Sequence, residues 1–276
     1  MNKIKKSTIA CMFIMILCII MPGALILADS WKKVDDSSLC RDGSSFFSES
    51  VCEVRELTID ETWDKISVDA TPNGSIKVES WDKDSIRIQA RVQVRAGSEE
   101  KAEEILSEIE IETGGNNVRA HGPKLFGSNK SWSVSFSLMV PVESDLKLNA
   151  MNGGISINDI NGNINAKTLN GGIALEGVSG DVEADTLNGG ITIDLDGDKW
   201  QGRGLEARTT NGGIKVGMPE KYSADLVAST VNGGIHIDFP ITVQGWIKKN
   251  IETKLGEGGA PVTLRTINGG VSVARK

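Results

Sequence analysis

Three carboxylates alternate along the chain after Ile193, at Asp194, Asp196 and Asp198. In an extended segment these side chains share one face, because side chains alternate along a β-strand. Glycosidases place two acids on either side of the bond that they cleave. The same acids also suit a solvated, bulged corner, where charge discourages the addition of another strand. We favour the second role and predict no catalytic residues and no enzymatic activity, with a carbohydrate-active β-helix enzyme as the alternative.

Other side chains that could do chemistry are few and scattered. The two histidines, His121 and His236, share no motif, and Tyr222 is the only tyrosine. A nucleophile needs a base and an orienting group within reach, and no spacing in the sequence suggests such a set. The glycine-aspartate nonapeptide of calcium-binding β-rolls is absent. We therefore predict no metal site and no cofactor.

Two of the six tryptophans, Trp200 and Trp246, lie where a repeat is interrupted. An indole in such an insertion either folds back over the body of the protein or faces a ligand, since it offers a large apolar surface with a polar edge. We name both as candidate ligand-facing residues.

The elements that must position these side chains come from the repeat itself. Asn-Gly-Gly followed by Ile or Val occurs six times, and the first two intervals are each 18 residues. The corner residues are Asn152, Gly153, Asn170, Gly171, Asn188, Gly189, Asn211, Gly212, Asn232, Gly233, Asn268 and Gly269. Glycine reaches positive φ without a clash and Asn tolerates it, so we expect these residues to turn the corners of stacked coils.

Aliphatic and polar residues alternate on both sides of each corner. The residue six before each Asn is always aliphatic, as at Leu146 and Ile164, and pairs such as Ile155 and Ile157 follow each corner. This period-two alternation predicts strands with one buried face. A half-repeat, Asn161-Gly162-Asn163, indicates that each coil has two strands and two corners.

The pattern predicts an all-β solenoid, or β-helix, of about 18-residue coils. An antiparallel meander is the rival, because Asn-Gly between apolar alternations is also a hairpin signal. We favour the solenoid because it places equivalent residues about 4.8 Å apart, where identical aliphatic and Asn side chains contact one another. The last interval, from Asn232 to Asn268, is 36 residues, so Phe239 to Gly259 replaces one coil of regular pattern.

Strands are also expected before the regular coils, which begin at about residue 146. The segments that alternate are 54–59, 66–70, 76–79, 86–94 and 132–140. Within them, Asn73-Gly74-Ser75-Ile76 is a degenerate copy of the later corner, so the stack is expected to start there.

One short helix is expected near the N-terminal end of the stack. Ser98 is a suitable N-cap, Glu99 and Glu100 follow it, and Ala102, Ile105 and Ile109 give one apolar face. We expect this helix to end by Gly114 and to cap the open end of the solenoid, where unpaired backbone groups would otherwise be exposed.

Residues 1–28 have the features of a signal peptide. Lys3, Lys5 and Lys6 precede a long apolar run that ends at Ala28, and an uncleaved membrane anchor is the alternative. Removing these residues takes away three lysines and no acid, so the net charge changes from −7 to −10. A strongly acidic protein is a poor partner for nucleic acid.

The remaining chain divides into a short lead-in and one long domain. Residues 29–52 form the lead-in, and Cys40 and Cys52 are expected to be joined by a disulfide, because they are the only cysteines left in an exported chain. Residues 53–276 form a single solenoid domain, since a solenoid grows by adding coils.

Several of these features occur together in one known family. They include Cys52-Glu53-Val54-Arg55-Glu56, the Asn73–Val78 strand, the acidic helix at 98–112, the Val140-Pro141 step into Leu146, the Asn-Gly-Gly-Ile repeats and the closing Leu255-Gly256-Glu257-Gly258-Gly259. From about Cys40 onwards the chain resembles the bacterial putative-adhesin family, a domain of unknown function. The resemblance implies an exported right-handed β-solenoid, an adhesin-like domain without an established activity.

These observations favour a non-enzymatic, exported module that acts in binding or in the structure of the envelope. Its expected partner is a protein or glycan of the cell envelope or surface, and its expected location is periplasmic, cell-surface or secreted. Contact with a membrane is expected only through an uncleaved signal segment, as in an envelope scaffold or sensor.

Overall fold

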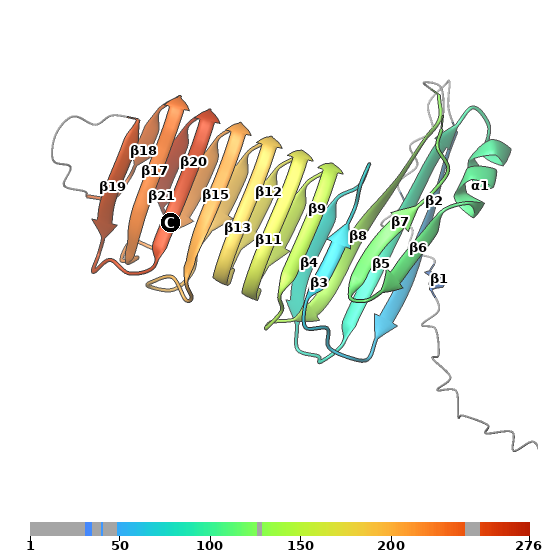
Figure 1. The fold of residues 1–276 in the computed structure, drawn as a ribbon, viewed down its shortest axis with the longest axis horizontal. Helices are drawn as coiled ribbons and strands as arrows, with labels where there is room; N and C mark the ends of the chain where they lie inside the picture. The colour runs from blue at the N-terminus through green and yellow to red at the C-terminus, as the bar shows by residue number, and fades with distance from the viewer. Residues whose placement is uncertain (1–30, 35–39, 41–48, 126–128, 241–248) are drawn as a thin grey trace, which may run out of the picture.

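The computed structural model describes residues 31–34, 40, 49–125, 129–240 and 249–276. Within them the chain forms one helix and two large sheets, which lie face to face along most of the molecule (Figure 1). Sheet 1 has eleven strands in the order β1 (Lys32–Val34), β2 (Glu49–Ile59), β5 (Ile86–Ala96), β8 (Ser131–Pro141), β4 (Ile76–Trp81), β10 (Ile155–Asn158), β12 (Ile173–Glu176), β14 (Ile191–Asp194), β16 (Ile214–Met218), β21 (Val271–Arg275) and β18 (Ile235–Ile237). Sheet 2 has ten strands in the order β19 (Asn250–Leu255), β17 (Ala224–Asn232), β20 (Pro261–Asn268), β15 (Gly204–Asn211), β13 (Ser179–Asn188), β11 (Asn161–Asn170), β9 (Leu146–Asn152), β3 (Ile66–Asp69), β7 (Asn117–His121) and β6 (Glu110–Gly114).

Consecutive strands of the repeat alternate between the two sheets. β9 lies in sheet 2, β10 in sheet 1, β11 in sheet 2 and β12 in sheet 1, and neighbours within each sheet are parallel. This is the pairing of a solenoid-like fold, and it contradicts the antiparallel meander that we kept as the rival. The expected strands at 54–59, 66–70, 76–79, 86–94 and 132–140 are present as β2, β3, β4, β5 and β8.

Equivalent residues of successive coils lie side by side and fill the space between the sheets. Ile155 pairs with Ile173, Ile173 with Ile191, and Ile191 with Ile214. Each of these four side chains is buried. Rows of identical aliphatic side chains therefore run along the stack, and the two sheets bury each other's inner faces.

Two coils do not follow the order of the sequence. The coil β3–β4 lies between β7–β8 and β9–β10, and it pairs in parallel with strands of both. At the other end, β20–β21 lies between β15–β16 and β17–β18. Stacking in chain order, which the repeat suggests, is therefore interrupted at both ends.

The helix begins as expected and ends earlier. α1 (Glu99–Ser107) has Ser98 as its N-cap, and the Ser98 side chain accepts a hydrogen bond from the Lys101 amide. Our expectation of a helix continuing to about 112 is wrong, because Glu110–Gly114 forms β6 and pairs antiparallel with β7. The residues after Ile109 alternate between partly buried and exposed, which suits a strand.

α1 packs against β2 and β5 at the end of the molecule opposite β19 (Figure 1). Its buried face consists of Ala102, Ile105 and Leu106. The Arg55 side chain donates hydrogen bonds to the Ile109 and Leu106 carbonyl oxygens, at 2.6 and 3.4 Å, and so connects β2 to the last turn of the helix and to the segment just after it.

The lead-in is fixed to sheet 1 in two ways. β1 pairs antiparallel with β2, and Cys40 and Cys52 form a disulfide with their Cα atoms 5.7 Å apart. Residues 1–28, which we expect to be a signal peptide, lie outside the described residues. In the part of the chain that the structure describes, no helix has the length and apolar character needed to cross a membrane.

Candidate functional site: the outer face of sheet 2

The corner asparagines form a continuous ladder. Asn170 Nδ2 donates a hydrogen bond to Asn152 Oδ1 at 2.9 Å, and Asn188 Nδ2 donates to Asn170 Oδ1 at 2.8 Å. In spatial order the ladder contains Asn73, Asn152, Asn170, Asn188, Asn211, Asn268 and Asn232. Every bond has the same polarity, and the degenerate corner at Asn73 occupies one end of the ladder. The stack itself does not start at this corner, contrary to our expectation, because β7 and β8 pair in parallel with β3 and β4 on the far side.

Buried threonines form a second ladder beside the first. Thr186 Oγ1 donates to the carbonyl oxygen of Gly171 at 2.8 Å, and Thr168 Oγ1 donates in the same way to Gly153. Thr209, Thr266 and Thr230 repeat this contact with Gly189, Gly212 and Gly269. These hydroxyls satisfy glycine carbonyls that would otherwise lack partners at the corner.

The reason that we gave for the corner glycines needs correction. None of the first glycines of the six Asn-Gly-Gly motifs has positive φ, and neither do their asparagines. Glycine is required there because coils approach closely: a Cβ atom at Gly171 would lie 2.1 Å from the Gly153 carbonyl oxygen. Positive φ occurs instead at half-repeat corners, at Gly177 and Gly180.

The residues just before the six Asn-Gly-Gly motifs form an exposed, mostly aliphatic column on sheet 2. In spatial order the aliphatic column contains Met151, Leu169, Leu187, Ile267 and Val231, with Thr210 between Leu187 and Ile267. Among the described residues, Val142 is the only other large hydrophobic side chain that is exposed. Six rungs span about 24 Å at the usual strand spacing. We did not predict this column, although the sequence alone places these aliphatic residues at outward-facing positions of the alternation.

Charged residues line the column on one side. Lys167 contacts Asp185 and Glu183, at 3.5 and 3.7 Å, and Arg208 contacts Glu183 and Glu206, at 3.1 and 2.7 Å. These pairs form a row of alternating charge across neighbouring strands. The row is partly exposed, so each pair contributes little to stability.

The outer face of sheet 2 contains hollows, and an apolar one and a polar one are lined by residues that the structure describes. The apolar hollow, of about 550 Å³, is lined by the column residues Leu187, Ile267 and Val231 and by Arg208 and Arg265. It opens where the small Thr210 stands in the column. Its lining is mainly apolar, and the guanidinium groups of Arg208 and Arg265 lie beside it.

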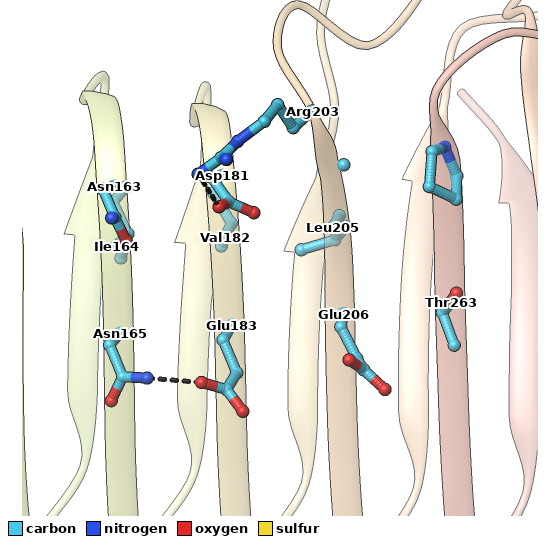
Figure 2. A pocket seen from close by; sticks show the side chains of 12 residues that line it. Asn163, Ile164, Asn165, Asp181, Val182, Glu183, Arg203, Leu205, Glu206 and Thr263 are labelled. Carbon is cyan, nitrogen blue, oxygen red and sulfur yellow. Dashed lines mark hydrogen bonds and ion pairs between the residues drawn. The ribbon is translucent and has the colours of Figure 1, made fainter.

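The second, polar hollow has about 350 Å³ (Figure 2). Gly204 and Thr263 leave space beside the longer side chains of Glu183 and Glu206. Arg203 reaches across to Asp181, and the Asn165 amide donates to Glu183 (Figure 2). Amide, guanidinium and carboxylate groups thus line this hollow, and they suit hydrogen bonding to a polar partner.

Two of the three alternating aspartates form ion pairs with a lysine. Lys276 Nζ contacts both Asp194 and Asp196, the latter at 2.9 Å, and these hydrogen bonds raise the pKa of Lys276. A glycosidase needs the space between its two acids for substrate and water, and here an ammonium group lies between them. Burial, assisted by Asp198 and Asp196, raises the pKa of Tyr222 to about 12.

Trp200 takes the first of the two arrangements that we considered. Its ring is buried, and its indole nitrogen donates to the Gly180 carbonyl oxygen at 3.0 Å, so it folds back over the stack. Trp246, the other candidate ligand-facing residue, lies outside the described residues.

The histidines lie at opposite ends of the molecule. His121 Nε2 lies 2.9 Å from Glu112 Oε2, and hydrogen bonds from His121 and Arg119 lower the pKa of Glu112. His236 lies exposed on β18. Within the described ranges, no group of three or more His, Cys, Asp or Glu residues is arranged to hold a metal ion.

Residues 61–274 match the family model described as Toastrack DUF4097. The chain belongs to this family. The match to Toastrack DUF4097 extends from just before β3 into β21, so it includes every coil of both sheets. No curated protein matches the chain.

Several solved structures are similar to this member of Toastrack DUF4097. A "putative cell adhesion protein" from Clostridium sporogenes is 12% identical, with 83% of this chain and 100% of that chain covered and a TM-score of 0.41. A "putative adhesin" from Bacteroides fragilis is 10% identical, with 81% and 97% covered and a TM-score of 0.38. A "putative lipid binding protein" from Parabacteroides distasonis is 12% identical, with 81% and 96% covered and a TM-score of 0.27.

Proposed function

We propose that this protein is a non-enzymatic, exported module of the cell envelope or cell surface that binds a partner through the outer face of sheet 2. Its architecture is a right-handed β-solenoid of about 18-residue coils, and residues 1–28 direct its export to the periplasm, the cell surface or the medium. The partner is a protein or glycan rather than nucleic acid, because the chain is strongly acidic.

The aliphatic column carries this proposal. Monomeric proteins rarely expose aligned apolar side chains, and such patches mark contact surfaces. Here the column lies beside a row of alternating charges, as in an interface with an apolar centre and a polar rim. The outward positions of β9, β11, β13, β15, β20 and β17 hold no aromatic residue, so the column favours a protein side chain over a stacked sugar ring.

Two substitutions on the column test the binding face. Leu187→Glu with Ile267→Glu places two charges in the apolar hollow, and we expect loss of binding to envelope components in pull-down and glycan-array measurements. The matched control, Thr192→Glu with Ser272→Glu, places the same charges on the outer face of sheet 1. A partner that wild type and control retain and the column variant loses supports the proposal. Equal retention by all three proteins contradicts it.

Location and catalysis are tested separately. Cell fractionation with sequencing of the mature N-terminus should find the protein outside the cytoplasm, with cleavage after Ala28 or, in an anchored form, with residues 1–28 retained. Common polysaccharides should not be degraded by the purified protein. If the purified protein does degrade a polysaccharide, and Asp194→Ala or Asp196→Ala abolishes this activity, the protein is a carbohydrate-active enzyme and the proposed binding function is wrong.

A further inference from the structure

The coil that comes last in the sequence occupies an internal position in the stack. β20 pairs in parallel with β15 on one side and β17 on the other, and β21 pairs in the same way with β16 and β18 (Figure 1). We call residues 261–275 the last coil, and the space between β15–β16 and β17–β18 the slot. Both walls of the slot precede the last coil in the sequence. The last coil must therefore be inserted between two earlier coils instead of being added to the end of the stack.

The two walls of the slot match the last coil in side-chain type. Val262 is fully buried between Leu205 and Leu226, and Val271 lies between Ile214 and Ile235. The slot therefore accepts a pair of strands with the inward pattern of this repeat.

Side-chain hydrogen bonds also connect the last coil to both walls. Asn268 donates to Asn211 at 2.8 Å and accepts from Asn232 at 2.9 Å. Thr266 donates to the Gly212 carbonyl oxygen at 2.8 Å. These contacts are made by residues of the corner motif. They therefore form only when the inserted coil is in the correct register, and not with any strand that happens to pair there.

The wall on the far side depends on the last coil. Among the described residues, β17 pairs with β19 and β20, and β18 pairs with β21. Apart from β20 and β21, strand pairing joins this wall to the coils before it only through a bridge between Lys199 and Ser223. When the last coil is out of the slot, β17–β18 with β19 can therefore move away from β15–β16 and open it.

The connection to the last coil is rich in glycine. Gly256, Gly258 and Gly259 all have positive φ in the turn between β19 and β20. Glycine adopts both this conformation and an extended one at little cost. The same segment can thus return the coil to its own slot or carry it away from the molecule.

We propose that the slot also binds the last coil of a second copy of this chain, so that two copies exchange coils. A coil from another copy makes the same backbone ladders and the same Asn and Thr contacts, and only the path of the connection differs. Exchange joins two stacks and presents two outer faces together, which strengthens binding to a partner with repeated sites.

Uptake of a labelled peptide tests whether the slot is open to exchange. The probe is a fluorescent peptide of residues 259–276, incubated with the full-length protein at temperatures up to the onset of unfolding and then cooled. We expect saturable uptake of one peptide per chain, measured by fluorescence anisotropy and size-exclusion chromatography.

The matched control peptide carries Gly269→Ala, a change of one methyl group. A Cβ at this position would lie 2.0 Å from the Gly212 carbonyl oxygen, so uptake should be lost. In the protein, Lys276→Ala removes the contacts to Asp194 and Asp196, and uptake of the normal peptide should become roughly threefold to tenfold faster. Absence of uptake of the normal peptide, or equal uptake of both peptides, overturns the proposal.

Exchange between whole chains is measured with two affinity tags. Two full-length proteins, each with a different tag, are heated together to the onset of unfolding and cooled, and we expect them to co-purify as a dimer in native mass spectrometry. Chains that take up peptide but never co-purify would show that the slot opens without joining two copies, which contradicts the assignment of a second copy as partner.

Discussion

The backbone of Gly189 passes so close to Gly171 that a Cβ atom at Gly189 would lie 2.0 Å from the Gly171 carbonyl oxygen. The next residue, Gly190, has more room, since a Cβ there would lie 3.3 Å from the Gly213 carbonyl oxygen. Two adjacent glycines of one motif therefore differ in their tolerance of a methyl group, and neither has positive φ.

Gly189→Ala should be strongly destabilising. The methyl group meets backbone, which cannot move without shifting a whole coil, so we expect a loss of about 3 kcal/mol or more in the free energy of unfolding. Gly190→Ala is the control and should cost less than about 1 kcal/mol. Urea denaturation followed by circular dichroism measures both. Similar losses for the two variants would contradict the close approach.

Thr186→Val should reveal the contribution of the threonine ladder. Valine has nearly the shape of threonine and lacks the hydroxyl that donates to the Gly171 carbonyl oxygen, so we expect a loss of about 1–3 kcal/mol. Thr192→Val is the control, because Thr192 is exposed on β14, and its effect should lie within about 0.5 kcal/mol. If both substitutions change the free energy of unfolding equally in urea denaturation, the hydrogen bond of the buried Thr186 hydroxyl does not stabilise the fold.

Tyr222 should ionise only at high pH, and its ionisation can be followed by absorbance. It is the only tyrosine, so phenolate absorbance reports a single group, and half-ionisation of the folded protein should come at about pH 12 rather than near 10.0. The folded state holds this proton more tightly than the unfolded state does. The contribution of Tyr222 to the free energy of unfolding is therefore fully present below pH 10.0 and is lost as the pH rises towards 12. Tyr222→Phe should lack both the absorbance change and this part of the alkaline loss. Half-ionisation near pH 10.0 while the protein is still folded would contradict the burial of the ring.

Deletion of one repeat should leave a shorter but folded protein. Removing residues 152–169 joins Met151 to Asn170, and β12 can then take the place of β10 beside β4. Removing residues 152–160 joins β9 directly to β11, which belong to the same sheet, so the strands after the cut are assigned to the wrong sheets. We expect a cooperative melt by circular dichroism for the first variant and none for the second. Equal tolerance of both deletions would mean that the 18-residue period is not a coil.

The strands of each coil could be predicted because the alternation of aliphatic and polar residues is visible within each strand by itself. Alternation at Ile155 and Ile157 marks an inner face whatever the neighbours are, and the register of the asparagines follows from the repeat. The early end of the helix was not predicted because the alternation of Glu110–Gly114 is short, and its partner β7 is what makes it a strand.

The order of the coils could not be read from the repeat. Val262 of β20 and Leu226 of β17 occupy the same place in the motif, so either strand would suit the position beside Leu205. The observed order brings together residues that are distant in the sequence, such as Lys276 with Asp194 and Asp196. The aliphatic column is a different case, because Leu187 and Ile267 lie at outward positions in the alternation. A search for aliphatic residues at outward positions would have found this column.

The internal position of the last coil determines how the protein bears mechanical load. A coil at the tip of a stack can be peeled away by breaking one set of ladder bonds, whereas residues 261–275 are bonded along both sides. Tension applied at Lys276 must break both sets before the coil leaves, and the two contacts of its side chain must break as well. Lys276 is therefore a mechanically strong point of attachment, and under tension the tip formed by β18 and β19 keeps its place until the last coil has been pulled out.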